Sequence, residues 1–215
     1  MKTYPLFLVG LDRARCVVVG GGTVAARKVN PLLRADAQVT VISPRLCRPL
    51  QGLAAGGEIN VVNRPYRSGD VEGAFLVIAA TDDVEINKAV WEEALALGLL
   101  VNVVDDPDRC NFIAPSVVRR GPLSLAISTA GRCPAFSRHL RKQLEREFGP
   151  AYGSFVEMLG SLREGVVRTL PIPERRAFWE DIFASDVLSL LASGDHEQAD
   201  QRAQEILEHH LLGVE

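Results

Sequence analysis

Short apolar runs rich in valine and isoleucine alternate with longer amphipathic stretches over the first half of the chain. The runs cover 16–19, 39–42, 59–62, 75–80 and 100–104. Such runs are typical of parallel strands that are buried on both faces. The stretches 23–34 and 84–97 repeat apolar residues at helical spacing. The alternation predicts an α/β fold with a Rossmann-type, doubly wound parallel sheet. Pro31 falls inside the first helical stretch, so we expect that helix to bend there or to end early.

The pattern changes after Asn111. The runs 117–119 and 123–128 flank a turn signal, Arg120-Gly121-Pro122, and predict two strands. Pro134 suits the first turn of a helix that extends to about Glu147. Beyond it only apolar helical faces recur. We therefore predict a Rossmann domain over 1–112, a small α+β region over 113–150, and a helical domain over 151–215.

A glycine-rich loop separates the first strand from the first helix. Gly20, Gly22 and Ala25 fit the dinucleotide-binding pattern G-x-G-x-x-G/A in its strand-turn-helix context. The free N–H groups and the dipole of the helix start favour an anion. We expect a pyrophosphate on the backbone of Gly22, Thr23 and Val24. The alternative is a tight turn that binds nothing.

Polar residues follow the fourth and fifth predicted strands, where ligands bind in open parallel sheets. Thr81, Asp82 and Asp83 follow one strand, and either aspartate has the alternative of capping the next helix. Asn102 and Asp105 end the other, and Asn102 is a candidate contact of the substrate. The Asp105 carboxylate suits general acid or base chemistry. Its alternative role is to close an Asx-turn before Pro107.

The segment 112–142 holds six cations and no acid, in a chain whose net charge is −3. It also holds the turn 128–131, which leads into a helix start and offers a second anion site. These features predict a polyanionic ligand, although we expect some of the cations to pair with downstream acids such as Glu145 and Glu147. The candidate contacts are Ser128, Thr129, Gly131, Arg132, Arg138 and Arg141.

Composition excludes several other classes. The negative net charge argues against nucleic-acid binding. No apolar run approaches the roughly 20 residues of a membrane span, and no signal peptide is visible, so we expect a cytoplasmic protein. The four cysteines and four histidines show no metal-ligand spacing, so no metal site is predicted.

The choice between NAD and NADP is left open by these residues. The acid expected on the ribose hydroxyl, about 20 residues after the glycines, is missing. The second strand instead ends in Ser43-Pro44-Arg45, and Asp36 precedes that strand. Arg45 by its charge favours NADP.

Several motifs together resemble precorrin-2 dehydrogenases and sirohydrochlorin ferrochelatases, including the N-terminal module of sirohaem synthases. The similar pieces run through the chain in order: Pro5-Leu6-Phe7, Val18-Val19-Gly20-Gly21-Gly22, Val24-Ala25-Ala26-Arg27-Lys28, Ala79-Ala80-Thr81-Asp82-Asp83, Asn102-Val103-Val104-Asp105, Phe112-Ile113-Ala114-Pro115-Ser116, Ile127-Ser128-Thr129-Ala130-Gly131 and Arg175-Arg176-Ala177-Phe178-Trp179-Glu180.

The resemblance implies an NAD-dependent oxidation of precorrin-2 to sirohydrochlorin, with ferrous iron insertion in some members. Because members of the family use NAD, the resemblance favours NAD despite Arg45, and it implies that NAD contacts Gly22, Thr23, Val24, Pro44 and Arg45. It also implies that Asp105 is the essential aspartate and that Ser128 and Thr129 lie on the substrate side. The domain 1–112 is then the NAD-binding domain, and 113–150 is the dimerisation and substrate-binding region of a homodimer. Two alternatives are an NAD-sensing regulatory module without catalysis and, less compatible with the glycine loop, a ferrochelatase that no longer binds NAD.

Overall fold

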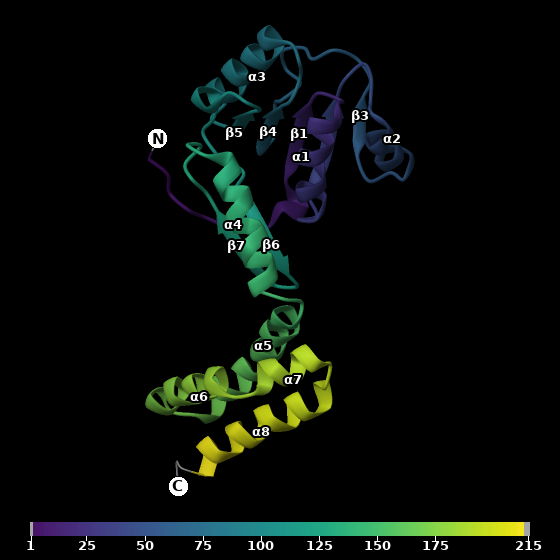
Figure 1. Ribbon diagram of the computed structural model, residues 1–215. Helices are drawn as coiled ribbons and strands as arrows, with labels where there is room; N and C mark the ends of the chain where they lie inside the picture. The colour runs from purple at the N-terminus through teal and green to yellow at the C-terminus, as the bar shows by residue number, and fades with distance from the viewer. Residues whose placement is uncertain (1, 213–215) are drawn as a thin grey trace. The chain divides into compact units, whose positions relative to one another are not determined.

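The computed structural model describes residues 2–212, so the outer ends of the predicted ranges 1–112 and 151–215 lie outside it. The chain divides into two compact units, one up to Ala114 and one from Pro115 onward. Figure 1 labels their helices and strands. Each unit is described by itself below.

The first unit is built on a five-stranded parallel sheet. Its strand order is β3-β2-β1-β4-β5, which matches the first five positions of the Rossmann order 3-2-1-4-5-6 and confirms the predicted fold. In the register, Val18 of the central strand lies opposite Val41 on one side and Ile78 on the other. The strands are β1 (Arg15–Val19), β2 (Gln38–Ile42), β3 (Asn60–Val62), β4 (Leu76–Ala79) and β5 (Leu100–Val103).

Alternate residues of β1 point to two separate apolar clusters. Cys16 and Val18 join the cluster that contains Val29 of α1, while Val17 and Val19 join the cluster that contains Val90 of α3. The sheet is therefore covered on both faces, which is why its strands are apolar throughout rather than alternating. The helices of this unit are η1 (Leu11–Arg13), α1 (Thr23–Leu33), α2 (Arg48–Ala55), α3 (Val84–Ala96) and η2 (Pro107–Arg109).

Two helical details differ from the sequence predictions. The helix α1 does not end at Pro31, because Arg34 N–H still donates to Asn30 O at 3.1 Å and the helix extends to Leu33. The missing proline N–H falls in the last turn, where a single lost bond costs little; the bend stays a prediction. The helix α2 was not predicted, because Pro49 and Gly52 interrupt the helical pattern over its eight residues.

The second unit begins with a β-hairpin, as the sequence predicted. The strands β6 (Ser116–Arg120) and β7 (Leu123–Ile127) pair antiparallel around a turn in which Gly121 has φ +51°. The helix α4 (Pro134–Glu147) packs against β6 and has the predicted bounds.

Helices form the rest of the second unit. Phe178, Ile182 and Val166 are almost fully buried at its centre. Within residues 2–212, no helix is both long and apolar enough to cross a membrane. The helices are α5 (Ala151–Thr169), α6 (Ile172–Ala184), α7 (Val187–Ser193) and α8 (His196–Leu212).

Candidate functional site

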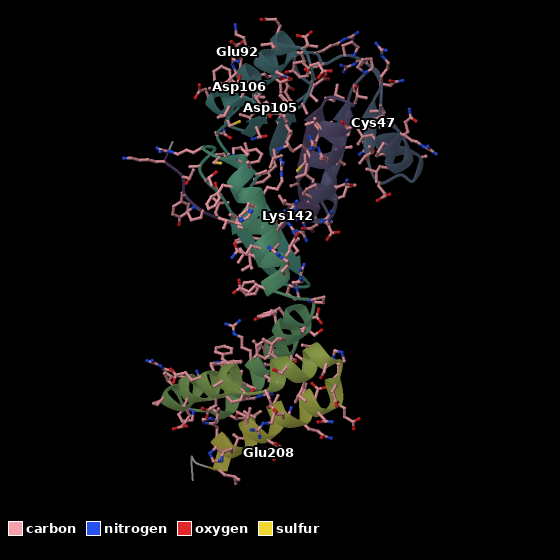
Figure 2. The ribbon with its side chains drawn as sticks, viewed as in Figure 1. Cys47, Glu92, Asp105, Asp106, Lys142 and Glu208 are labelled. Atoms are coloured by element: carbon pink, nitrogen blue, oxygen red, sulfur yellow. The ribbon has the colours of Figure 1, made fainter. Side chains whose placement is uncertain are left out.

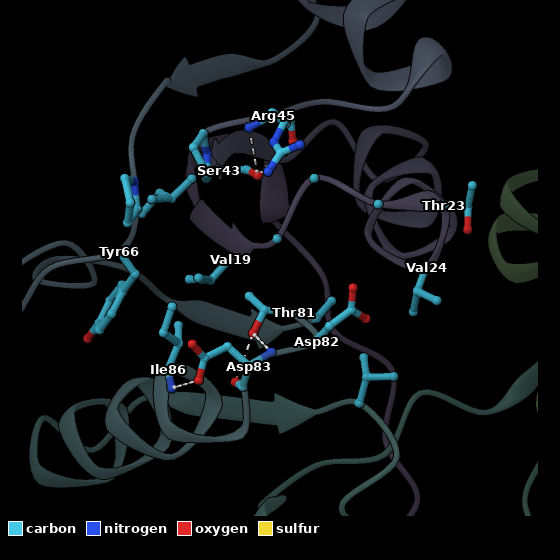
Figure 3. Close-up of a pocket in the computed structure, with 18 of the residues that line it drawn as sticks. Val19, Thr23, Val24, Ser43, Arg45, Tyr66, Thr81, Asp82, Asp83 and Ile86 are labelled. Atoms are coloured by element: carbon cyan, nitrogen blue, oxygen red, sulfur yellow. Dashed lines mark hydrogen bonds between the residues drawn. The ribbon is translucent and has the colours of Figure 1, made fainter.

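A cavity of about 660 Å³ opens at the carboxyl edge of the parallel sheet. Figure 3 shows the residues that line it. Most of them come from the loops that follow the five strands β1 to β5. The structure therefore brings together most of the residues predicted for the nucleotide and catalytic sites: Gly20, Gly22, Thr23, Val24, Pro44, Arg45, Thr81, Asp82 and Asp105.

The glycine loop has open space in front of Gly22, whereas Gly20 is packed against its neighbours. Gly20 has φ +125°, and a Cβ there would overlap the backbone of Ala80. At Gly22 a Cβ would meet no atom within 4 Å, so the space in front of this residue is open. The close approach at Gly20 fixes the turn, and the opening at Gly22 suits a pyrophosphate.

The amino end of α1 faces this opening with free donors. The first helical hydrogen bond is from Ala26 N–H to Gly22 O at 3.1 Å, and no side chain caps the helix. The N–H groups of Thr23 and Val24 therefore have no partner in the helix. The arrangement fits the phosphates of a dinucleotide, as the sequence predicted.

Gly21 is a requirement that the sequence analysis missed. A Cβ at this position would lie 2.6 Å from Ser43 Oγ and would overlap Arg45 O. Cys47 N–H donates to Gly21 O at 2.7 Å. The loop after β2 thus presses directly on the glycine loop. The dinucleotide pattern leaves this position free, so only the tertiary contact reveals its role.

The loop after β2 is held in place by a buried hydroxyl. Ser43 Oγ donates to Arg45 O at 2.7 Å and accepts from Arg45 N–H at 3.3 Å. These bonds place Pro44 and Arg45 at the cavity wall.

The loop after β4 carries two aspartates with different roles: Asp83 caps a helix, and Asp82 is free to contact a ligand. Asp83 caps α3 by accepting from Glu85 N–H at 2.9 Å and Ile86 N–H at 3.1 Å, so the capping alternative holds for this residue. Thr81 is tied to the buried amide of Asn87 by a 2.8 Å bond from its hydroxyl. Asp82 is exposed and lines the cavity.

Asp105 lies at the cavity wall in an unusual backbone conformation. Its φ is +61°, in the left-handed region that residues other than glycine seldom adopt. It is exposed, and its carboxylate accepts no Asx-turn hydrogen bond within residues 2–212. Figure 2 shows Asp105 and Asp106 at this end of the unit. The carboxylate is therefore available to a ligand in the cavity.

The turn that carries Asp105 is braced by Cys110. Its thiol donates to Asp106 O at 3.1 Å and to Val103 O at 3.3 Å. Burial raises the pKa of Cys110, which keeps the thiol protonated as a donor. Asp106 also pairs with Arg109 at 2.5 Å. The sequence analysis gave Cys110 no role, because its partners are backbone carbonyls.

Asn102 lies at the end of β5, as predicted, but its side chain does not face the cavity. It is 8% exposed, and its amide donates to Phe112 O at 3.1 Å and to Cys110 Sγ at 3.4 Å. Its side chain is thus engaged in the same brace and is not free to bind a substrate. The sequence placed it correctly at the end of β5 but not the direction in which it points.

Lys28 is a further charged group close to Asp105. It lies on the second turn of α1 and is half-buried. Burial lowers its pKa, while the negative charge of Asp105 opposes that change. The sequence offered no signal for this placement, because Lys28 and Asp105 are far apart in the chain.

The predicted substrate residues lie in the second unit, where the turn before α4 uses its own hydroxyls. Ser128 Oγ accepts from Ala130 N–H at 3.1 Å, and Thr129 Oγ1 accepts from Cys133 N–H at 3.1 Å. Gly131 follows with φ +77°. The turn has the predicted position at the helix start, and its hydroxyls also shape it.

The cations of segment 112–142 are divided between paired and unpaired groups. Arg141 forms an ion pair with Glu145, as the alternative allowed. Arg120 donates to Phe148 O and Glu145 O, both at 2.7 Å. Arg132 and Arg138 are exposed and form no ion pair within residues 2–212. These two have the charge most available to an anion.

Metal-ligating side chains do not gather in the described part of the chain. Among residues 2–212, no three or more His, Cys, Asp or Glu side chains are placed to hold a metal ion. His210 is buried between Glu174 Oε2 at 3.3 Å and Asp181 Oδ2 at 2.9 Å, which makes it part of the helical core.

Comparison with protein families divides the chain as its structure does. A family described as putative NAD(P)-binding matches residues 7–116, the sirohaem biosynthesis protein central family matches 120–147, and the sirohaem synthase dimerisation region matches 151–207.

Similar proteins cover nearly the whole chain. The Siroheme synthase of Methylobacillus flagellatus is 42% identical over 208 residues, 96% of this chain and 44% of the relative. Siroheme synthase 1 of Pectobacterium atrosepticum is 41% identical over 96% of this chain and 43% of its own length. The chain therefore spans less than half the length of these curated relatives.

A solved structure matches over its full extent. SirC, a precorrin-2 dehydrogenase, superposes with a TM-score of 0.74 at 25% identity, over 95% of this chain and 100% of that one. The resemblance predicted from the sequence is confirmed. The chain belongs to the family described as putative NAD(P)-binding.

Proposed function

We propose that this chain oxidises precorrin-2 to sirohydrochlorin with NAD as the hydride acceptor. The observation that carries the proposal is the cavity that the glycine loop lines, with the exposed Asp105 carboxylate at its wall. The match to the whole length of a precorrin-2 dehydrogenase supports the same reaction. The part shared with the longer siroheme synthases is then their dehydrogenase part.

Different residues of the first unit bind the cofactor and take part in the reaction. NAD, when bound, supplies the position that takes a hydride. The amino end of α1 and the open face of Gly22 hold its phosphates. A proton must leave the macrocycle when a hydride is removed. Asp105 either accepts that proton or orients the tetrapyrrole.

The second unit supplies the charges that attract the substrate. Precorrin-2 carries several carboxylates, and Arg132 and Arg138 are exposed cations without ion-pair partners in residues 2–212. Ser128, Thr129 and Gly131 form the turn that leads into α4 beside them. We assign this turn and these cations to the binding of the substrate.

We also propose that the protein is a homodimer. The region that matches the sirohaem synthase dimerisation family leaves large apolar side chains in solvent. Ile172 is 77% exposed, Phe183 62% and Val167 50%. A second copy would cover them. Light scattering tests this: a mass of twice 23.4 kDa supports the dimer, and a stable 23.4 kDa species contradicts it.

The direct test mixes the protein with NAD and precorrin-2 under anaerobic conditions. We expect the absorbance of sirohydrochlorin and of reduced nicotinamide to rise together, in equal amounts. An NAD-sensing regulatory module would bind NAD and leave precorrin-2 unchanged. Adding ferrous iron after completion measures sirohaem formation, the second activity that the resemblance implies.

A further inference from the structure

Asp105 occupies a tight turn that its own side chain does not hold. Asp106 N–H donates to Val103 O at 3.3 Å and closes a four-residue turn in which Asp105 is the third residue. Its φ of +61° lies in the left-handed region, which favours glycine or asparagine at that position of a type II turn. Among residues 2–212 the Asp105 carboxylate accepts no hydrogen bond. Other groups must therefore hold the turn.

The sulfur of Cys110 lies across the base of this turn. It is 3.3 Å from Val103 O at the start of the turn and 3.1 Å from Asp106 O at its end. A thiol has one hydrogen, so the two carbonyl oxygens share it. A single side chain thereby ties together the two ends of the turn that carries Asp105.

Cys110 is itself fixed to the sheet. Its backbone forms an isolated antiparallel bridge with Asn102 of β5, and the Asn102 amide donates to its sulfur at 3.4 Å. The same amide donates to Phe112 O at 3.1 Å. Burial raises the pKa of the Cys110 thiol, which therefore keeps its hydrogen at neutral pH. The turn is thus bonded to a donor that β5 holds in place.

We propose that Cys110 is a positioning residue for Asp105, whose carboxylate it keeps in the orientation that the reaction needs by bonding both ends of the turn. A residue other than glycine stays in the left-handed region where the surrounding structure enforces that conformation. Without the sulfur, Asp105 relaxes toward a more common backbone conformation and its carboxylate moves. The inference rests on the proposed function in that it takes Asp105 as the carboxylate that acts on the substrate.

Three variants of Cys110 separate its hydrogen bonds from its volume. Cys110→Ala removes both. Cys110→Val keeps much of the volume without a donor, and valine suits the extended backbone at this position, where φ is −128° and ψ is 132°. Cys110→Ser keeps a donor and is the conservative variant expected to rescue the turn.

The matched control is Asp108→Ala. Asp108 lies in η2, between the turn and Cys110, and is exposed. Within residues 2–212 it forms no ion pair, and it does not line the cavity. This variant therefore changes the same segment without touching the bonds of the sulfur.

The first measurement does not depend on activity. Hydrogen exchange of the Asp106 amide, followed by NMR, reports opening of the turn because this N–H closes it. We expect exchange to be about tenfold faster in Cys110→Ala and Cys110→Val, as for loss of one hydrogen-bonding group. Exchange should stay close to the wild-type rate in Cys110→Ser and Asp108→Ala.

The second measurement is the single-turnover rate of precorrin-2 oxidation at saturating NAD. The rate should fall about tenfold in Cys110→Ala and Cys110→Val, because a small misplacement of a reacting group slows the chemical step. NAD affinity should be unchanged, and Cys110→Ser should recover most of the rate. In an Asp105→Gly background, Cys110→Ala should cause no further loss, because the sulfur acts through that carboxylate.

Two results overturn the inference. One is a wild-type oxidation rate in Cys110→Ala or in Cys110→Val. The other is a loss in the Asp105→Gly background as large as the loss in the wild-type background, which would show that the sulfur acts elsewhere. If the wild-type protein does not oxidise precorrin-2, the proposed function fails instead, and the exchange of the Asp106 amide still decides whether Cys110 holds the turn.

Discussion

The candidate sites of the two units depend on different features of the chain, backbone geometry in the first and side-chain charge in the second. The nucleotide cavity of the first unit is defined by backbone: the close approach at Gly20, the opening at Gly22 and the free amides of α1. The substrate segment of the second unit is defined by side-chain charge, and part of that charge is already used. Arg141 is paired with Glu145, and Arg120 donates to two carbonyls.

The difference shows which kind of site can be predicted from the sequence. A backbone site depends on residues that have no alternative, because a side chain at Gly20 or Gly21 would overlap its neighbours. A charge site depends on which cations remain free after folding, and the count of charges does not determine that. A single substitution should therefore abolish the first kind of site and only weaken the second.

The largest expected effect is at Asp105, the one catalytic carboxylate proposed for the backbone-built cavity. Asp105→Ala should lower the dehydrogenation rate by about 10²–10⁴-fold with NAD still bound, as for loss of a general base. Single-turnover absorbance measurements check this. Equal losses in Asp105→Asn and Asp105→Ala support the base role, and a nearly normal Asp105→Asn supports an orienting role.

The left-handed backbone at Asp105 calls for a further control. Alanine is strained at φ +61°, whereas asparagine and glycine tolerate it. Asp105→Gly therefore removes the carboxylate without that strain. Full activity in both Asp105→Gly and Asp105→Ala would show that Asp105 has no part in the reaction.

The next effect concerns Gly22 and the phosphates. Gly22→Asp should weaken NAD binding by about a hundredfold, because a carboxylate would face the pyrophosphate at short range. The fold should survive, since Gly22 has an ordinary φ of −81° and an aspartate is a good helix cap. Calorimetry measures the affinity. Gly22→Asn is the neutral control, and unchanged affinity in Gly22→Asp would refute this placement of the phosphates.

A smaller effect is expected from the charge-built segment. Neutralising Arg132, Arg138 and Arg141 together should weaken tetrapyrrole binding by about tenfold, since exposed charge contacts are each worth little. Arg141→Gln alone should matter least, because its charge is already paired. Fluorescence titration at two salt concentrations checks this. An affinity indifferent to salt and to all three substitutions would remove these cations from the substrate site.

The smallest expected effect is on thermal stability and comes from the ion pair between Arg64 and Asp70. Arg64 hydrogen-bonds Asp70 and thereby lowers the pKa of that carboxyl. A lowered folded-state pKa stabilises the protein above about pH 4, and the contribution disappears as the pH falls through the lowered value. Asp70→Asn should therefore lower the Tm by a few degrees at neutral pH and by less in acid. A difference in Tm that grows on acidification would contradict this assignment.

Much of the first unit could be predicted because its signals are local. The valine-rich runs became β1 to β5 within one or two residues, since strands buried on both faces must be apolar. The glycine spacing located the phosphate-binding turn for the same reason, because only small residues fit there. Asp83 was recognised as a possible cap from its place before a helix. The short helix α2 was missed because proline and glycine obscure it.

The tertiary structure decided where side chains point and which of them are already engaged. The sequence by itself determined the sheet, the glycine loop and the position of Asp105 at a strand end. Apolar strand runs and glycine spacing can be recognised from neighbouring residues alone. Only the fold turned Asn102 inward to Cys110 and Phe112 and set Gly21 against the loop that carries Arg45. It also paired Arg141 while leaving Arg132 and Arg138 exposed. These outcomes depend on contacts between segments far apart in the chain, or on which of several cations pairs with a given acid. Neither can be predicted from a local sequence pattern.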